Sequence, residues 1–227
     1  MISHKHKCIF LHIPKCAGTS VESLLGHHEL YSGISKQDHR SLRMVQKPLC
    51  RVSVLSSIEN VVEIFRAVKY LFSPNIPNPL SKLTLSSKQY EAYYKFTIVR
   101  NPWARIDSWY RAVMGDPVMK DSLGLHDNCT LYEALSIHAG KGLLKSQLYW
   151  LKDFSGVVPM DCIAKFETLS DDFKSIAKAL NLETDKLPHM LLSKGSGNSY
   201  QSRFDEKSRN LVSEVYAEEI EMFGYQF

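Results

Sequence analysis

The stretch KCIFLHIPKCAGTS, residues 7–20, decides how this chain folds. Its first half, residues 7–13, is a short apolar run with high β propensity, which indicates a buried strand. The rest of the stretch is a turn of small and polar side chains, and VESLLGHH, residues 21–28, then has helical spacing. A strand, a tight turn and a helix in this order are typical of the opening unit of an α/β fold.

Apolar strands and amphipathic helices continue to alternate along the rest of the chain. Further strands are predicted over residues 51–55, 94–99 and 162–166. Further helices are predicted over residues 38–46, 57–70, 102–114, 130–138, 141–151, 170–180 and 205–223. Residues 73–82 contain three prolines and residues 115–128 are polar, so both are predicted as loops. The alternation predicts a parallel α/β sheet.

The composition is that of an ordinary globular protein. The chain has 227 residues, of which 44% are hydrophobic and 23% charged, and its formal net charge is +4. That charge does not require a nucleic-acid partner, and no basic stripe interleaved with aromatic residues occurs. The five cysteines are widely spaced without a CxxC pair, which argues against a disulfide framework or a zinc site and favours a reducing compartment. The apolar run near the N-terminus is too short for a signal peptide or a membrane span, so we expect a soluble, cytoplasmic chain.

The turn after the first strand has the features of an anion-binding loop. Small residues let the backbone wrap closely around an anion, and the N–H groups of the following helix point towards it. Lys15 adds a cation, but it precedes the glycine of the loop, so the sequence is not a Walker A motif. The alternative is an ordinary turn with a solvated lysine. The candidate residues are Lys15, Cys16, Ala17, Gly18, Thr19 and Ser20.

A second group of polar residues follows the strand predicted over residues 94–99. Arg100 stands at the end of that strand, where open α/β sheets bind ligands. Arg105 and Ser108 are three residues apart on the next helix and therefore share a face. An arginine fork with a hydroxyl suits a second phosphate. The alternative is a structural arginine that caps the edge of the sheet.

Together these two motifs resemble a known family. IFLHIPKCAGTS, residues 9–20, and FTIVRNPWARIDSWY, residues 96–110, are similar to the two signatures with which carbohydrate sulfotransferases bind 3′-phosphoadenosine 5′-phosphosulfate (PAPS). The most similar group includes the heparan and uronyl 2-O-sulfotransferases, the chondroitin 4-O enzymes and bacterial relatives. The likeness continues through IAKFETLSDDFKSIAKALNL, residues 163–182, and FDEKSRNLVSEVYAEEIEMFGYQF, residues 204–227.

The resemblance implies a fold and a domain organisation. We expect a P-loop-like three-layer α/β domain whose central, mostly parallel sheet is flanked by helices. We expect residues 1–227 to form this single domain. Residues 47–93 look longer than the matching stretch in compact bacterial relatives, which makes them a possible insertion for acceptor specificity.

The resemblance also implies an activity and its site residues. The enzyme would transfer a sulfuryl group from PAPS to a hydroxyl acceptor, expected to be a carbohydrate, without a metal, and would release adenosine 3′,5′-bisphosphate. The loop from Lys15 to Ser20 would hold the 5′-phosphosulfate, and Lys15 would neutralise the leaving oxygen. Arg100 and Ser108 would hold the 3′-phosphate.

The resemblance further implies a closing loop near residues 193–203, with Lys194 and Arg203 as extra contacts to the nucleotide. Relatives often carry asparagine where this chain has Ser193.

The catalytic base is expected to be a histidine or a carboxylate. His39, in the stretch QDHRSLR, matches the place where many relatives have a histidine, and histidine is the side chain most often used to remove a proton. Asp38 or Glu29 are the alternatives, and the competing interpretation of His39 is a surface residue that caps a helix. His12, inside the first strand, is expected to be a hydrogen-bonded core residue.

Two other functions remain open from the sequence. The first is a P-loop kinase that uses ATP, against which the missing Walker A lysine argues. The second is a catalytically inactive nucleotide- or glycan-binding protein with the same fold. The acceptor and the oligomeric state do not follow from the residues.

Overall fold

A computed structural model describes the chain in six stretches, which are residues 1–27, 37–46, 54, 57–73, 79–187 and 199–227. By its internal contacts the chain divides into two compact units. The first unit contains Met1–Ile13, Ala17–Val99 and Gln147–Leu191. The second unit contains Pro14–Cys16, Arg100–Ser146 and Leu192–Phe227. We describe each unit by itself, and the single domain expected from the sequence stays a prediction.

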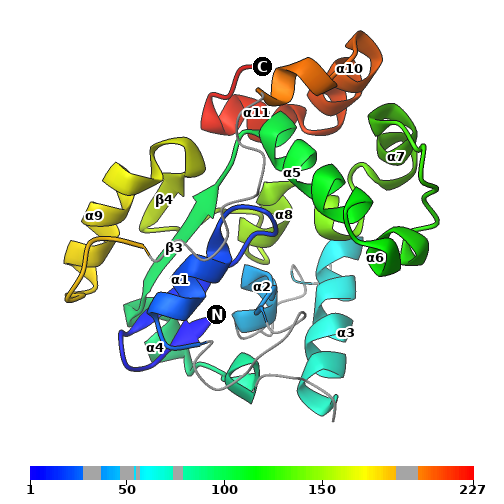
Figure 1. Ribbon diagram of the computed structural model, residues 1–227. Helices are drawn as coiled ribbons and strands as arrows, with labels where there is room; N and C mark the ends of the chain where they lie inside the picture. Colours follow the sequence, from blue (N-terminus) through cyan, green and yellow to red (C-terminus); the bar gives the residue numbers. More distant parts are fainter. Residues whose placement is uncertain (28–36, 47–53, 55–56, 74–78, 188–198) are drawn as a thin grey trace. The chain divides into compact units, whose positions relative to one another are not determined.

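The first unit is built on a four-stranded sheet (Figure 1). Its strands, in their order across the sheet, are β1 (Ile2–Ser3), β2 (Cys8–Leu11), β3 (Tyr94–Val99) and β4 (Cys162–Lys165). β1 pairs antiparallel with β2, whereas β2–β3 and β3–β4 are parallel pairs. The parallel pairs confirm the mostly parallel α/β sheet. The predicted strand at 51–55 lies outside the described residues except for Val54, which is not in a strand.

Helices of the first unit pack on this sheet and on one another. They are α1 (Gly18–Leu24), α2 (Leu42–Val45), α3 (Ile58–Phe72), α4 (Ser87–Ala92), α8 (Gln147–Leu151) and α9 (Leu169–Ala179). α9 packs against β3 and β4, and α2 packs against α3 and α8. The helix predicted over residues 38–46 is shorter than expected, because the side chain of Ser41 accepts from the N–H of Met44 and starts α2 there.

The helix predicted over residues 57–70 is confirmed as α3, but its apolar stripe faces away from the core. Ile58, Phe65 and Phe72 are 85%, 71% and 82% exposed. The opposite face carries the buried Asn60 and Glu63. Polar contacts from other helices therefore hold α3 in place.

The second unit is made of short helices around its own core (Figure 1). They are α5 (Pro102–Met114), α6 (Pro117–Ser122), α7 (Leu131–His138), α10 (Glu206–Val215) and α11 (Ala217–Phe223), with 3-10 turns η3 (Gly142–Leu144) and η5 (Tyr200–Arg203). Its core includes Trp103, Trp109, Leu135, Val212 and Tyr216. Among the described helices, none combines the length and the apolar character that a transmembrane span requires.

Three predictions in the second half of the chain need correction. Residues 115–128 contain α6, because Asp116 caps a helix whose first residue is Pro117. The single helix predicted over residues 205–223 is two helices, which separate at Tyr216. The hydroxyl of Tyr216 donates to a carbonyl at position 144, so a tertiary contact fixes this break. The helix predicted over residues 141–151 is likewise divided into η3 and α8.

Candidate active site

The backbone of the predicted anion loop is strained in the way that anion-binding loops are. Lys15 and Ala17 both have left-handed backbone conformations, with φ of 70° and 62°. Such a conformation costs a residue with a side chain about 1–2 kcal/mol. Left-handed residues within a tight turn direct successive N–H groups to one side, where they form an anion-binding concavity. The loop backbone therefore supports the anion-binding interpretation of this turn.

A close approach of two residues of the first unit explains the glycine of the loop. A Cβ atom on Gly18 would lie 2.1 Å from Cδ2 of His12, so any other residue would force the His12 ring to move. His12 is buried, and its Nδ1 lies 2.9 Å from Oε1 of the fully buried Glu22 on α1. Burial by itself raises the pKa of Glu22, but the charge and hydrogen bond of His12 outweigh burial and lower it. His12 is thus the hydrogen-bonded core residue that the sequence predicts.

His39 lies directly beside His12 in the first unit. The centroids of the two imidazole rings are 4.3 Å apart, and Nδ1 of His39 lies 3.0 Å from the backbone carbonyl oxygen of His12. Burial, and then the charge of His12, lower the pKa of His39 to about 4, so the ring is neutral at pH 7. Because Nδ1–H donates to the carbonyl, the lone pair is on Nε2. This is the tautomer that a proton acceptor needs.

The structure disfavours Asp38, one of the two alternatives to His39. Asp38 is fully buried, and both of its carboxylate oxygens accept from Arg40. Although burial raises the pKa of Asp38, the charge of Arg40 outweighs it and holds that pKa well below its usual range, which makes Asp38 a weak base. Glu29 lies outside the described residues. His39 does not cap a helix, because the side chain of Ser41 caps α2.

Cations gather in the second unit around the first part of the loop. Nη1 of Arg100 donates to the carbonyl of Lys15 over 3.2 Å. Burial, followed by the charges of Arg100 and Arg111, lowers the pKa of Lys15. No carboxylate pairs with Lys15 in the described part of the chain. A positive potential of this kind suits a bound anion.

Arg105 does not have the phosphate-binding role that its spacing predicts. Its guanidinium is buried, and it donates to the carbonyls of Pro14, Leu143 and Lys145 over 3.1, 2.7 and 3.0 Å. These bonds engage all three nitrogens of the buried guanidinium, so we interpret Arg105 as a structural residue that holds the start of the loop. Ser108 is half-buried on the same helix, and its hydroxyl makes no hydrogen bond to another described residue.

Of the two nucleotide contacts expected in the closing loop, Arg203 lies among the described residues, at the end of η5. Its Nη2 donates to Oδ2 of Asp107 over 2.9 Å, and its Nε donates to the other carboxylate oxygen. The same carboxylate accepts from Nε of Arg111 over 3.0 Å. Arg203 is thus fixed on α5 in the second unit. Lys194 lies outside the described residues.

Two further residues of these groups were missed in the sequence. Arg111 is three residues after Ser108, a spacing that puts both on one face of α5. Gln37 lies between two predicted site residues, since its side chain contacts Oγ1 of Thr19 and Nε2 of His39 over 2.7 and 3.0 Å. Only its position two residues before His39 could have drawn attention to it.

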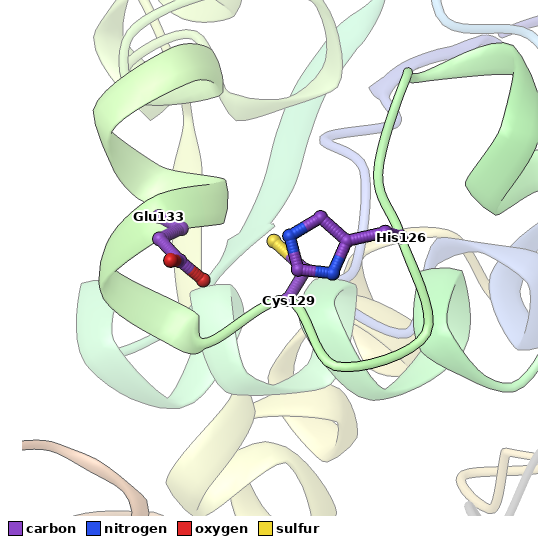
Figure 2. A group of neighbouring side chains, drawn as sticks. All are labelled: His126, Cys129 and Glu133. Atoms are coloured by element: carbon purple, nitrogen blue, oxygen red, sulfur yellow. The ribbon is translucent and has the colours of Figure 1, made fainter.

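One group of side chains has donor atoms of the types that bind a metal. Donor atoms of His126, Cys129 and Glu133 lie within 4.8 Å of one another (Figure 2). Glu133 is engaged in the capping box of α7, where it accepts from the N–H and hydroxyl of Thr130. Burial, and then the charge of Glu133, raise the pKa of the Cys129 thiol, which keeps it protonated. We interpret the group as the start of α7, and the expectation of a metal-free site stays a prediction.

The comparison with known proteins adds one finding. A family model described as the sulfotransferase family matches residues 1–120, which is more than half of the 227 residues. The matched range includes the loop, His39 and Arg100. No curated protein and no solved structure matches the chain.

Proposed function

The chain belongs to the sulfotransferase family, and on that premise we propose that it transfers a sulfuryl group from PAPS to a hydroxyl group of a carbohydrate. The observation that carries the proposal for the donor is the group of Lys15, Arg100 and Arg111 next to a left-handed loop. A donor with phosphates at two positions needs such a set of cations and N–H groups. The carbohydrate acceptor rests on the sequence resemblance.

The residues fit the donor in two places. The loop from Lys15 to Ser20 would hold the 5′-phosphosulfate through its N–H groups and its two hydroxyls. Arg100 and Ser108 would hold the 3′-phosphate, and the half-buried hydroxyl of Ser108 has no other partner among the described residues. PAPS would supply the activated sulfuryl group.

His39 would act as the base in a single in-line displacement. Its Nε2 would take the proton of the acceptor hydroxyl while the acceptor oxygen bonds to sulfur. The bond from sulfur to the phosphate oxygen breaks, and its electron pair stays on that oxygen. Lys15 would stabilise the negative charge that develops there.

A binding experiment tests the donor, and a transfer experiment tests the reaction. We expect adenosine 3′,5′-bisphosphate to raise the unfolding temperature more than ATP with Mg²⁺ does, because a ligand that binds only the folded state stabilises it. We expect ³⁵S from labelled PAPS to appear on an unsulfated glycan that serves as the acceptor. Lys15→Ala should lower this transfer roughly 100- to 1,000-fold, whereas Lys5→Ala, which alters an exposed lysine, should leave it unchanged.

The outcomes separate the competing functions. Stabilisation by ATP with Mg²⁺ alone would indicate a kinase. Binding of the bisphosphate without transfer to any hydroxyl would indicate an inactive binding protein. A chain that binds neither nucleotide would refute the proposal.

A further inference from the structure

A chain of three hydrogen bonds in the first unit joins a loop hydroxyl to the proposed base. It runs from Oγ1 of Thr19 to the amide of Gln37, on to Nε2 of His39, and from Nδ1 of His39 to the carbonyl of His12, over 2.7, 3.0 and 3.0 Å. We propose that Gln37 is a positioning residue that takes the place of the acceptor hydroxyl on His39, and that it holds the hydroxyl of Thr19 until the acceptor displaces it. This inference rests on the proposed function.

The protons of the chain can be assigned atom by atom. Nδ1 of His39 faces a carbonyl, so it carries a proton. Because burial lowers the pKa of His39 to about 4, Nε2 carries none at pH 7 and must accept a hydrogen bond. In the structure the amide oxygen of Gln37 faces Nε2 of His39, and its NH₂ group faces Oγ1 of Thr19. A half-turn of the amide exchanges its nitrogen and oxygen and gives Nε2 the donor that it needs. The amide oxygen then faces Thr19, whose hydroxyl must donate to it.

The amide and the acceptor compete for one lone pair. A neutral imidazole nitrogen has a single lone pair in the plane of its ring, so Nε2 accepts one hydrogen bond. An acceptor hydroxyl that is to lose its proton to Nε2 must bond at the place where the Gln37 amide bonds. The amide N–H and the acceptor O–H are equivalent there, since each donates to Nε2. Gln37 therefore leaves His39 when the acceptor arrives, and without the acceptor it keeps water from this atom.

Displacement of Gln37 changes what Thr19 can do. While Gln37 is in place, the hydrogen of the Thr19 hydroxyl points to the amide oxygen. When the amide leaves, this hydrogen becomes free to donate to an oxygen of the phosphosulfate, whose charge grows as the bond to sulfur breaks. Binding of the acceptor thus strengthens binding of the donor phosphate, and by thermodynamic linkage the donor strengthens binding of the acceptor.

The first test measures access to Nε2 and does not depend on any nucleotide. Diethyl pyrocarbonate acylates imidazole nitrogens with an available lone pair, and peptide mass spectrometry locates the product. We expect Gln37→Met, a variant of similar length without the amide, to raise the acylation rate of His39 at least about threefold, as for the loss of one net hydrogen bond. The exposed His126 is the internal reference, and Gln226→Ala, at an exposed glutamine, is the matched control.

The second test measures the link to Thr19 by a double-mutant cycle. We expect Gln37→Met to bind adenosine 3′,5′-bisphosphate about three- to tenfold more tightly than the wild type in the absence of acceptor. Thr19→Val should remove this gain when both changes are combined. We also expect Gln37→Met to release sulfate from PAPS faster without an acceptor, because water reaches His39. Thermal unfolding checks that each variant is folded. If Gln37→Met is not folded, Gln37→Glu takes its place. In that variant we expect acylation of His39 to slow, because the carboxylate favours the protonated, unreactive ring.

The outcomes distinguish this inference from the proposed function. An unchanged acylation rate of His39 in the variants of Gln37 would overturn the inference, whatever the nucleotide does. Equal affinity for the bisphosphate in the wild type and Gln37→Met would overturn the link to Thr19. A wild-type protein that binds no bisphosphate would instead overturn the proposed function, and the release of Thr19 to the donor with it.

Discussion

Gly18→Ala isolates one steric contact on which the site depends. The added Cβ would lie 2.1 Å from Cδ2 and 2.4 Å from Nε2 of His12, whereas ordinary contact begins at 3.4 Å, so the ring must retreat by about 1.3 Å. Gly18 is a helical residue without a left-handed conformation, so alanine itself adds no backbone strain. The imidazole of His12 has little room, because it is bonded to Glu22 and lies 4.3 Å from the ring of His39.

The cost of this change has two parts. Overpacking of a buried site costs about 1–3 kcal/mol. Loss of the bond between His12 and the buried carboxylate of Glu22 adds about 1–3 kcal/mol. Together we expect Gly18→Ala to lower the free energy of unfolding by about 2–6 kcal/mol. For a chain of this size, that lowers the unfolding temperature by roughly 4–24 °C.

Thermal unfolding followed by circular dichroism measures this change. The double variant Gly18→Ala/His12→Ala lacks the imidazole ring with which the new Cβ would clash. Its free energy of unfolding should therefore be less than about 1 kcal/mol below that of His12→Ala. The reasoning would be refuted if Gly18→Ala were as stable as the wild type. It would also be refuted if Gly18→Ala lowered the free energy of unfolding equally in the wild type and in His12→Ala.

Four other predictions follow from the described contacts. His39 has a pKa of about 4 in the folded chain against an ordinary 6.5, so the fold disfavours its protonation; stability is present above pH 6.5 and is lost as pH falls towards 4, by up to roughly 3 kcal/mol. His39→Asn should not show this part of the acid loss in urea titrations at pH 7 and pH 4.5. Phe65→Ser, on the exposed stripe of α3, should change the free energy of unfolding by less than about 0.5 kcal/mol, whereas Glu63→Ala, on its buried face, should cost about 3 kcal/mol; equal costs in urea titrations would contradict the orientation of α3. Arg111→Ala should weaken binding of adenosine 3′,5′-bisphosphate roughly five- to tenfold in calorimetry, and unchanged affinity would remove Arg111 from the site. Thr130→Ala should cost about 1 kcal/mol through the lost cap of α7, and a stability that depended on zinc or a chelator would show that the neighbouring donors bind metal.

Much of the candidate site could be proposed from the sequence, because its residues lie close together there in two short motifs. The loop at residues 14–20 and Arg100 stand directly after apolar strands, and the order of parallel strands brings such ends to one edge of a sheet. The family match over residues 1–120 agrees with this interpretation. The role of Arg105 was not predictable, because its partners at positions 143 and 145 are about 40 residues away in the chain.

For His39, too, the sequence indicates the residue, whereas contacts distant in the chain decide its chemistry. The sequence singles out His39 as a residue type suited to take a proton. Its tautomer follows from the carbonyl of His12, which is 27 residues away. Its low pKa follows first from burial and then from the charge of His12. The contact of Gln37 with Thr19 spans 18 residues, and no periodicity or motif indicates it.

The sequence by itself determined where most strands and helices form, because the spacing of apolar residues at periods of 2 and 3.6 is a local property. Only the tertiary structure decided which face each helix buries. In α3 the apolar stripe is exposed, and the carboxylate of Glu63 is buried because Ser41, Arg66 and Tyr149 donate to it. The physical reason is that a charge enters a protein interior only when its hydrogen-bond partners converge there. Ser41, which caps α2, and Tyr149, on α8, lie outside α3, so packing brings these partners together and the pattern within α3 does not.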